Sequence, residues 1–256
     1  MREKRSPKMK MTKAILVLVA VFAMSTTVQA VTLYSEDFDG ATDGAALTSL
    51  GWIPAFGNVP NVTSAAPLGG GSDLAIDQST AVTGQTFSRH PRVAPSAGAL
   101  SYTLEADLYA NTGGSFNSGF GFGVGTTEQV SLTWLDGWFF RVTAGWSGAA
   151  GTAATFTTNT QAVDEEVRAR IHFDLVADTV QATIIGASGT FTSPLTSFLD
   201  GNESNLGDIM VYADLRGTGG QNPTDVDNVL LYDFIPEPAT LAVLALGGLA
   251  LIGRRK

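Results

Sequence analysis

The sequence predicts an all-β protein, built as a two-sheet antiparallel sandwich of the jelly-roll type. Residues 100–108 and 167–175 alternate strictly between apolar and polar side chains over nine positions, as strands with one buried and one solvated face do. Between the two chain ends, no stretch has the 3.6-residue period of an amphipathic helix. About 205 residues remain between those ends, which suits one β-sandwich domain.

Eight further strands are expected along the chain. A tight connection at residues 177–179 predicts that residues 167–185 form an antiparallel hairpin. The joining segments are rich in Gly, Ser, Asn and Pro, at residues 57–72, 111–118, 145–152 and 186–205. The further strands are expected at residues 32–37, 83–89, 119–125, 129–135, 138–144, 180–185, 209–215 and 226–234.

The N-terminal 30 residues have the pattern of a secretory signal peptide. An apolar helical segment at residues 14–24 precedes Val28-Gln29-Ala30, a small-residue cleavage motif. The mature chain is therefore expected to begin at Val31, after action by the export machinery and signal peptidase. Cysteine is absent from the chain, which excludes a disulfide framework. The basic residues before the apolar segment are Arg2, Lys4, Arg5, Lys8, Lys10 and Lys13.

The C-terminal end is a second targeting segment. Pro236-Glu237-Pro238 precedes fourteen uncharged residues, 239–252, and the chain then ends on the basic residues Arg254, Arg255 and Lys256. Spanning a bilayer takes about 20 apolar residues, so this hydrophobic helix is expected to anchor the chain in the inner membrane only transiently. The basic residues would stay on the cytoplasmic side. A helix of a soluble domain is the alternative, although such a helix would be apolar on every face.

The order, spacing and position of these three C-terminal parts resemble the PEP-CTERM proteins of Gram-negative, exopolysaccharide-producing bacteria. The resemblance implies that residues 235–256 are a sorting segment. It also implies that a membrane protease, exosortase, cuts at or near Pro236-Glu237-Pro238. The chain would then be released to the cell envelope, the surface or the extracellular matrix.

Charge is distributed very unevenly along the chain. Nine of the 15 lysines and arginines lie in the two ends, so residues 31–235 hold six arginines, no lysine and 22 of the 24 acidic residues, a formal charge of −16. Such a surface repels nucleic acid, which we exclude as a partner. The carboxylates suit divalent cations, although acidic charge also serves solubility alone.

Two further motifs bear on the domain at residues 31–234. The motif Glu36-Asp37-Phe38-Asp39-Gly40 is followed by Leu50-Gly51-Trp52, and residues 225–231 read Asp-Val-Asp-Asn-Val-Leu-Leu. They resemble the opening and the closing strand of concanavalin-A-like (laminin-G-like) jelly rolls. This resemblance implies that the first and last strands lie side by side.

If those strands are neighbours, five carboxylates converge at one edge of the sandwich. Repulsion between them would be relieved by a hard cation with oxygen ligands, so a structural calcium ion is expected there. The alternative is a set of hydrated carboxylates at a turn. The candidate ligands are Glu36, Asp37, Asp39, Asp225 and Asp227.

Catalytic residues are not expected. Glu105 and Asp107 share one face of a strand, and laminarinase-type glycoside hydrolases use Glu-x-Asp-x-x-Glu on such a strand, with two glutamates in the reaction. Here Ala110 stands where the second glutamate would be, and the pair is interpreted as the solvated face of the strand. His90 and His172 lack the spacing of a zinc site.

Polysaccharide binding is the expected activity, because exposed aromatic rings stack on sugars. Trp146 lies in a loop of small residues and Trp138 follows a turn, so both are candidate stacking rings. Trp134 shares its face with apolar residues and is expected in the core. We thus expect an exported, non-catalytic surface or matrix protein. An atypical polysaccharide-active enzyme, either a glycoside hydrolase or a lyase, and a purely structural or adhesive protein remain alternatives.

Overall fold

The computed structural model describes the β-sandwich and its immediate flanks. The described residues are 28–56, 59–64, 68, 75–77, 85–110, 117–123, 128–134, 137–144, 154–155, 162–197, 206–214 and 225–236. The expected signal helix and C-terminal hydrophobic helix lie outside them. Among the described residues, no helix has the length and apolar character needed to cross a membrane.

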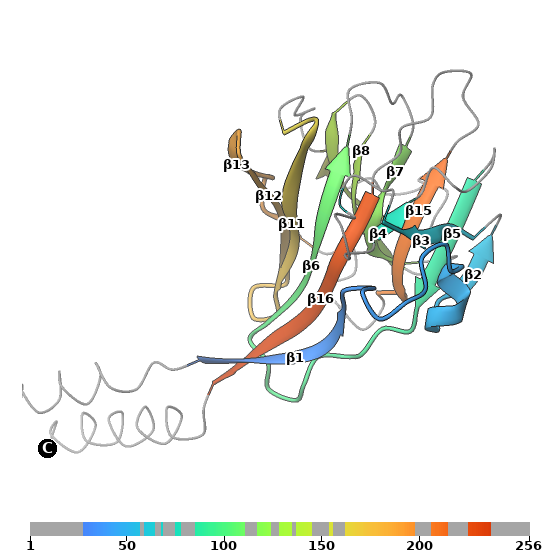
Figure 1. Cartoon of the computed structure of the whole chain (residues 1–256). Helices are drawn as coiled ribbons and strands as arrows, with labels where there is room; N and C mark the ends of the chain where they lie inside the picture. The colour runs from blue at the N-terminus through green and yellow to red at the C-terminus, as the bar shows by residue number, and fades with distance from the viewer. Residues whose placement is uncertain are drawn as a thin grey trace, which may run out of the picture.

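Two antiparallel sheets form the molecule, as predicted (Figure 1). In the nine-stranded sheet A, the order is β13 (Gly189–Thr192), β12 (Thr179–Gly186), β11 (Glu165–Asp174), β6 (Ser101–Ala110), β16 (Asp225–Pro236), β4 (Ala75–Asp77) and β3 (Asn61–Thr63), with β1 (Val28–Glu36) also paired to β16 and β14 (Thr196–Ser197) to β12. In the seven-stranded sheet B, the order is β10 (Ala154–Thr155), β9 (Trp138–Ala144), β8 (Glu128–Trp134), β7 (Asn117–Phe122), β15 (Ile209–Asp214), β5 (Gln85–His90) and β2 (Ile53–Phe56). A short 3-10 helix, η1 (Leu47–Leu50), precedes β2.

The core lies between the sheets and is filled by alternate residues of the long strands. On β11, the buried members are Val167, Ala169, Ile171 and Phe173, which are the apolar positions of the predicted alternation. Aromatic rings join the two layers: Phe122 of sheet B lies 5.6 Å from Tyr102 and 5.6 Å from Phe173 of sheet A, between ring centroids. Such aromatic contacts add to the apolar area that the sandwich buries.

Each of the ten predicted strands is present, with ends shifted by a few residues. The first and last strands, β1 and β16, are paired, as the resemblance implied, and β11 and β12 form the predicted hairpin. Six short strands were not predicted: β2, β3, β4, β10, β13 and β14. Of these, β13 and β14 lie within the expected connection 186–205, and β3 lies within 57–72. Strands of two to four residues show no alternation in sequence, because hydrogen bonds to a neighbouring strand define them.

The β1–β16 pair extends beyond the predicted domain limits at both ends. Val28 pairs with Pro236, Gln29 with Ile235 and Ala30 with Phe234. The strand pair therefore includes three residues before the predicted cleavage point and two after residue 234. The ends of β1 and β16 are set by the pairing between the two strands. The residue pattern within either segment alone does not reveal that pairing.

The close approach of β8 to β7 explains why glycine occupies position 119 in the run of alternating glycines. A Cβ atom added at Gly119 would lie 2.1 Å from the carbonyl oxygen of Leu132 and 2.8 Å from the Cα of Thr133, both backbone atoms of β8. We expect Gly119→Ala to lower the free energy of unfolding by about 1–3 kcal/mol, because backbone on the neighbouring strand must move. Urea denaturation measures the change. Gly40→Ala is the control, since nothing lies within 4 Å of its added Cβ, and an equal loss in both variants would contradict the explanation.

Candidate functional site

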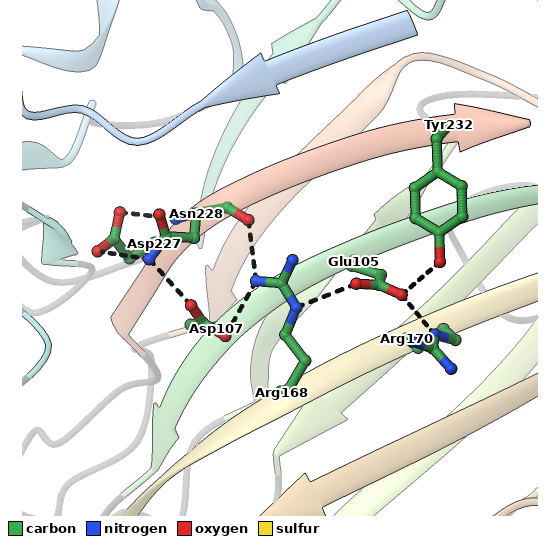
Figure 2. A network of polar contacts seen from close by, with 7 residues as sticks. All are labelled: Glu105, Asp107, Arg168, Arg170, Asp227, Asn228 and Tyr232. Carbon is green, nitrogen blue, oxygen red and sulfur yellow. Dashed lines mark hydrogen bonds and ion pairs between the residues drawn. The ribbon is translucent and has the colours of Figure 1, made fainter. Parts of the chain in front are cut away.

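A polar network crosses the outer face of sheet A at its centre (Figure 2). It arises from strand pairing. In the β6–β11 ladder, Arg168 is opposite Asp107 and Arg170 is opposite Glu105, and residues two apart on a strand point to the same face. We call this set the outer network: Glu105 and Asp107 of β6, Arg168 and Arg170 of β11, and Asp227, Asn228 and Tyr232 of β16.

Glu105 lies at the centre of the outer network and is bonded by three side chains. Its Oε1 accepts hydrogen bonds from Tyr232 Oη and from Arg170 Nε, each at 2.5 Å, and its Oε2 pairs with Arg168 Nε at 3.1 Å. Only 7% of its side chain is exposed. Burial by itself would raise the pKa of Glu105, but the Tyr232 hydrogen bond and the two guanidinium groups lower it below its ordinary value. The carboxylate therefore stays ionised and fixed in position.

Asp107 and Asp227 lie opposite each other on β6 and β16, and Asn228 bridges them. Asn228 Nδ2 donates to Asp107 Oδ2 at 2.9 Å and to Asp227 Oδ2 at 3.4 Å. Arg168 Nη1 donates to Asp107 Oδ1 at 3.0 Å and to the Asn228 carbonyl oxygen at 3.3 Å. The ladder is irregular between Asp227 and Leu230, and Asn228 has a left-handed φ of 49°, which asparagine adopts more readily than most residues. This bulge places an amide donor between two carboxylates that would otherwise repel each other.

Among the carboxyl groups of the described residues, Asp227 has a strongly raised pKa. Burial raises its pKa to about 7; the backbone N–H of Asn228 opposes the shift, and the carboxylates of Asp39, Asp107 and Asp37 add to it. Only 5% of the residue is exposed. Near neutral pH this group is therefore divided between its protonated and ionised forms.

Aromatic and neutral polar groups adjoin the outer network. The rings of Tyr232 and Phe234 meet edge to face with centroids 5.4 Å apart, and both residues are half-buried. His172 Nδ1 lies 2.8 Å from Thr103 Oγ1. Burial and the neighbouring Arg170 lower the pKa of His172, so its ring is neutral at physiological pH. Burial and the hydrogen bond to Glu105 raise the pKa of Tyr232 to about 12, so its hydroxyl keeps its proton.

The face of Glu105 and Asp107 is not solvated as predicted. Glu105 is buried, and both carboxylates are ion-paired with arginines of β11. The interpretation was wrong because alternation in β6 reports which face is polar. It does not report whether charges on neighbouring strands neutralise that face.

The predicted calcium ligands are only partly brought together. Asp37 and Asp39 lie near enough to Asp227 to raise its pKa. However, Glu36 Oε1 accepts from the backbone N–H of Phe38 at 3.0 Å and Asp37 Oδ1 from that of Asp39 at 3.3 Å. Within the described part of the chain, no group of three or more His, Asp or Glu side chains is arranged to hold a metal ion. The residues therefore do not fit the expected site in this arrangement, and calcium binding stays a prediction.

The two predicted stacking tryptophans differ in outcome. Trp138 is fully buried; its Nε1 donates to the carbonyl oxygen of Ala162 at 3.3 Å, and its ring meets Trp134 edge to face at 5.3 Å. It cannot stack on a sugar, and that prediction was wrong because Trp138 lies on the buried side of β9 together with Phe140 and Val142. Trp134 is in the core, as predicted. Trp146 lies outside the described residues.

The predicted processing residues fall at the edge of the described chain. Ala30 and Val31 lie within β1 and are paired to Phe234 and Asp233. Pro236 is the last residue of β16. The remaining members, Glu237, Pro238, Arg254, Arg255 and Lys256, lie outside the described residues.

Four members of the outer network were not predicted: Arg168, Arg170, Asn228 and Tyr232. The sequence did contain a signal for a functional face. Arg168, Arg170 and His172 occupy alternate positions of one strand, in a domain that has only six arginines and no lysine. Their carboxylate partners lie more than 60 residues away in sequence, so the pairing could not be identified without the sheet order.

Comparison with known proteins identifies the tail. The PEP-CTERM protein-sorting motif matches residues 234–256. This chain carries a PEP-CTERM sorting signal. The signal implies export, processing by exosortase-type machinery and a location in the cell envelope or at the surface. No curated protein matches the sequence.

Solved structures share the fold at low sequence identity. A protein of unknown function from Shewanella oneidensis MR-1 is 14% identical, with 92% of this chain and 97% of that chain covered and a TM-score of 0.51. A β-1,3-glucanase from Mycobacterium marinum is 15% identical, with 78% and 98% covered and a TM-score of 0.51. A lectin from Bauhinia forficata in complex with GalNAc is 10% identical, with 82% and 99% covered and a TM-score of 0.47. The two likenesses with a TM-score of 0.51 show a shared two-sheet β-sandwich fold and nothing further.

Arg168 should contribute strongly to stability, because its removal takes away the guanidinium partner of Asp107 and one of the two guanidinium partners of Glu105. We expect Arg168→Met to lower the free energy of unfolding by about 2–3 kcal/mol. Urea denaturation at neutral pH measures it. Arg89→Met is the matched control: Arg89 pairs with Asp208 at 2.6 Å, but the side chains are 39% and 27% exposed, so a loss of about 1 kcal/mol or less is expected. Equal losses would contradict the role given to the outer network.

Asp227 should make stability depend on pH. Its pKa in the folded protein, about 7, exceeds its ordinary value of 3.8, so the folded state binds the proton more tightly than the unfolded state. The free energy of unfolding should therefore fall as pH rises from about 4 to 7, by about 2–4 kcal/mol from this group. Asp227→Asn should flatten that dependence and be more stable than the natural chain at pH 8. Denaturation across this pH range tests it, with Asp178→Asn in an exposed turn as control; an unchanged pH profile in Asp227→Asn would contradict the assignment.

Proposed function

We propose that this exported protein binds polysaccharide without cleaving it, and that the central outer face of sheet A is the binding surface. The observation that carries the proposal is the set of bonds around Glu105, in which two guanidinium groups and a phenol hold one carboxylate. The sorting signal, which implies a location in the cell envelope or at the surface, supports the proposal. The fold supports the proposal only generally, because one sandwich hosts many functions.

The chemistry of this face suits sugar hydroxyls. Arg168 and Arg170 have side chains 29% and 38% exposed, and they present planar groups of fixed orientation beside ionised acceptors. Preorganised groups of this kind lose little side-chain entropy when a ligand binds. The half-buried rings of Tyr232 and Phe234 add an apolar surface on which a pyranose ring can lie.

Charge balance on this face favours an uncharged polysaccharide. Arg168 and Arg170 are offset by Glu105 and Asp107 at contact distance. The rest of the mature domain is strongly acidic, so it repels polymers of uronic acids at long range. A neutral polymer rich in hydroxyl groups is not repelled by the acidic domain and needs no net charge on the binding face.

Two features support binding without cleavage. Retaining glycosidases need a carboxylate that attacks the sugar and a second carboxyl group that supplies a proton. Here Glu105 and Asp107 are both neutralised by arginine. The amide of Asn228 lies between Asp107 and Asp227, where a scissile bond would have to enter.

Polysaccharide hydrolysis is the second candidate, and one observation favours it. Asp227, with a pKa of about 7, lies beside the ion-paired Asp107. A carboxyl group whose pKa is raised toward neutrality is a recurring feature of catalytic acids. If the protein is a hydrolase, Asp227 would donate a proton to the leaving-group oxygen of the glycosidic bond after Asn228 had moved aside.

Binding should be measured on the mature chain from Val31, with an array of neutral and acidic polysaccharides. We expect binding to a neutral polymer, and at least about tenfold weaker binding in Arg170→Gln and Tyr232→Phe, because each removes a fixed hydrogen-bonding group. Arg141→Gln is the control: it removes an arginine of β9 in sheet B, whose guanidinium lies 5.7 Å from the Phe139 ring centroid. Equal affinity in all variants would contradict this binding surface.

The same samples separate the alternatives. If the natural chain releases reducing ends from a polysaccharide and Asp227→Asn does not, the protein is a hydrolase and the proposal of binding without cleavage is wrong. Absence of binding to every polymer would leave the structural or adhesive role. Repeating the array with a chelator reports whether the expected calcium ion is needed.

A further inference from the structure

The β1–β16 ladder connects the two ends of the protein that are processed. In register, Ala30 is paired with Phe234, Gln29 with Ile235 and Val28 with Pro236. The predicted signal-peptidase cut, between Ala30 and Val31, thus lies across the ladder from the start of the sorting signal at residue 234. In Figure 1, β1 and β16 run side by side beyond the rest of the sandwich, and their outer ends point the same way.

Removal of the signal peptide changes the environment of the sorting signal. It takes away Val28, Gln29 and Ala30, which are the β1 partners of residues 234–236. On the other edge of β16, β6 reaches only as far as Phe234: Ser101 pairs with Phe234, and the N–H of Leu100 donates to its carbonyl oxygen at 2.7 Å. After the cut, Ile235 and Pro236 have no strand partner among the described residues.

We propose that signal-peptide cleavage unmasks the tail-processing segment, so that exosortase-type processing follows signal-peptidase processing. A segment already paired in a sheet cannot offer its backbone to a second protein, whereas an unpaired extended segment can be bound as an added strand. While residues 28–30 are present, the segment leading into Pro236-Glu237-Pro238 is held in the ladder. The proposal rests on the predicted cut after Ala30 and is independent of polysaccharide binding.

The size of the effect follows from the number of pairs lost. Opening a ladder end by three residue pairs breaks a few backbone hydrogen bonds, each of modest net strength. Tail processing of a chain that keeps its signal peptide should therefore be slower by about tenfold or more. The remaining β1 residues, from Val31 to Glu36, stay paired with β16, so the domain stays folded after the cut.

The test uses the full chain in a bacterium with exosortase-type machinery. Ala30→Tyr removes the small residue that signal peptidase needs and keeps a good strand former at an exposed position. We expect this variant to retain its tail at least about tenfold longer than the natural chain in a pulse–chase experiment read by mass spectrometry. The double variant Gln29→Pro, Ala30→Tyr should recover tail processing, because proline cannot donate a hydrogen bond to the ladder.

Two controls make the result decisive. Gln29→Pro alone should process its tail at the natural rate, because residue 29 is removed with the signal peptide. Hydrogen exchange of the Ile235 backbone amide, whose β1 partner Gln29 is lost in the cut, is measured on the purified natural mature chain and on Ala30→Tyr. It should be at least about tenfold faster in the natural mature chain. This readout does not depend on the protease.

Three results would overturn the proposal. Tail loss from Ala30→Tyr at the natural rate would show that pairing does not protect the segment. Failure of the double variant to recover would show that retention by the signal peptide, and not strand pairing, slows processing. A natural mature chain that starts at or before Val28 would leave the ladder intact and remove its premise.

Discussion

The pairing of β16 organises this protein. Along one edge β16 is bonded to β6, and along the other it is bonded to β1 and, near its start, to β4. One face of the strand places Leu231 in the core against Leu104. The other face carries Asp227 and Tyr232 to the outer network, and the end of the strand is the start of the sorting signal. Because a strand has only two faces and two edges, a single register sets core, surface and tail together.

The outer network shows how an acidic domain uses few cations. Residues 31–235 hold six arginines against 22 acidic residues, yet two of the six lie side by side at the centre of sheet A. A carboxylate as buried as Glu105 is tolerated in the ionised form only when it is paired and hydrogen-bonded. Arg168, Arg170 and Tyr232 satisfy that condition. The same bonds that make the buried charge tolerable also hold hydrogen-bonding groups in fixed positions near the surface.

The ends of the chain and its middle serve different purposes, and they meet in one ladder. The signal at residues 234–256 directs sorting, whereas the sandwich carries the outer network, which is our proposed binding surface. With 14–15% identity to structures of the same fold, the middle is defined by its own site residues and not by its relatives. Our proposed function therefore depends on Arg168 and Arg170 and not on the overall architecture.

The sequence by itself determined the fold class, the ten main strands and the sorting tail, because each depends on local composition or on a period-two pattern. It also placed Trp134 in the core, through its apolar strand neighbours. Tertiary structure alone decided which charges meet: Glu105 and Arg168 are 63 residues apart, and only the strand order makes them neighbours. It likewise decided that Trp138 faces inward, that Asp227 is buried among carboxylates, and that Ala30 lies opposite Phe234. Each of these depends on cross-strand register, a long-range property that no single segment encodes.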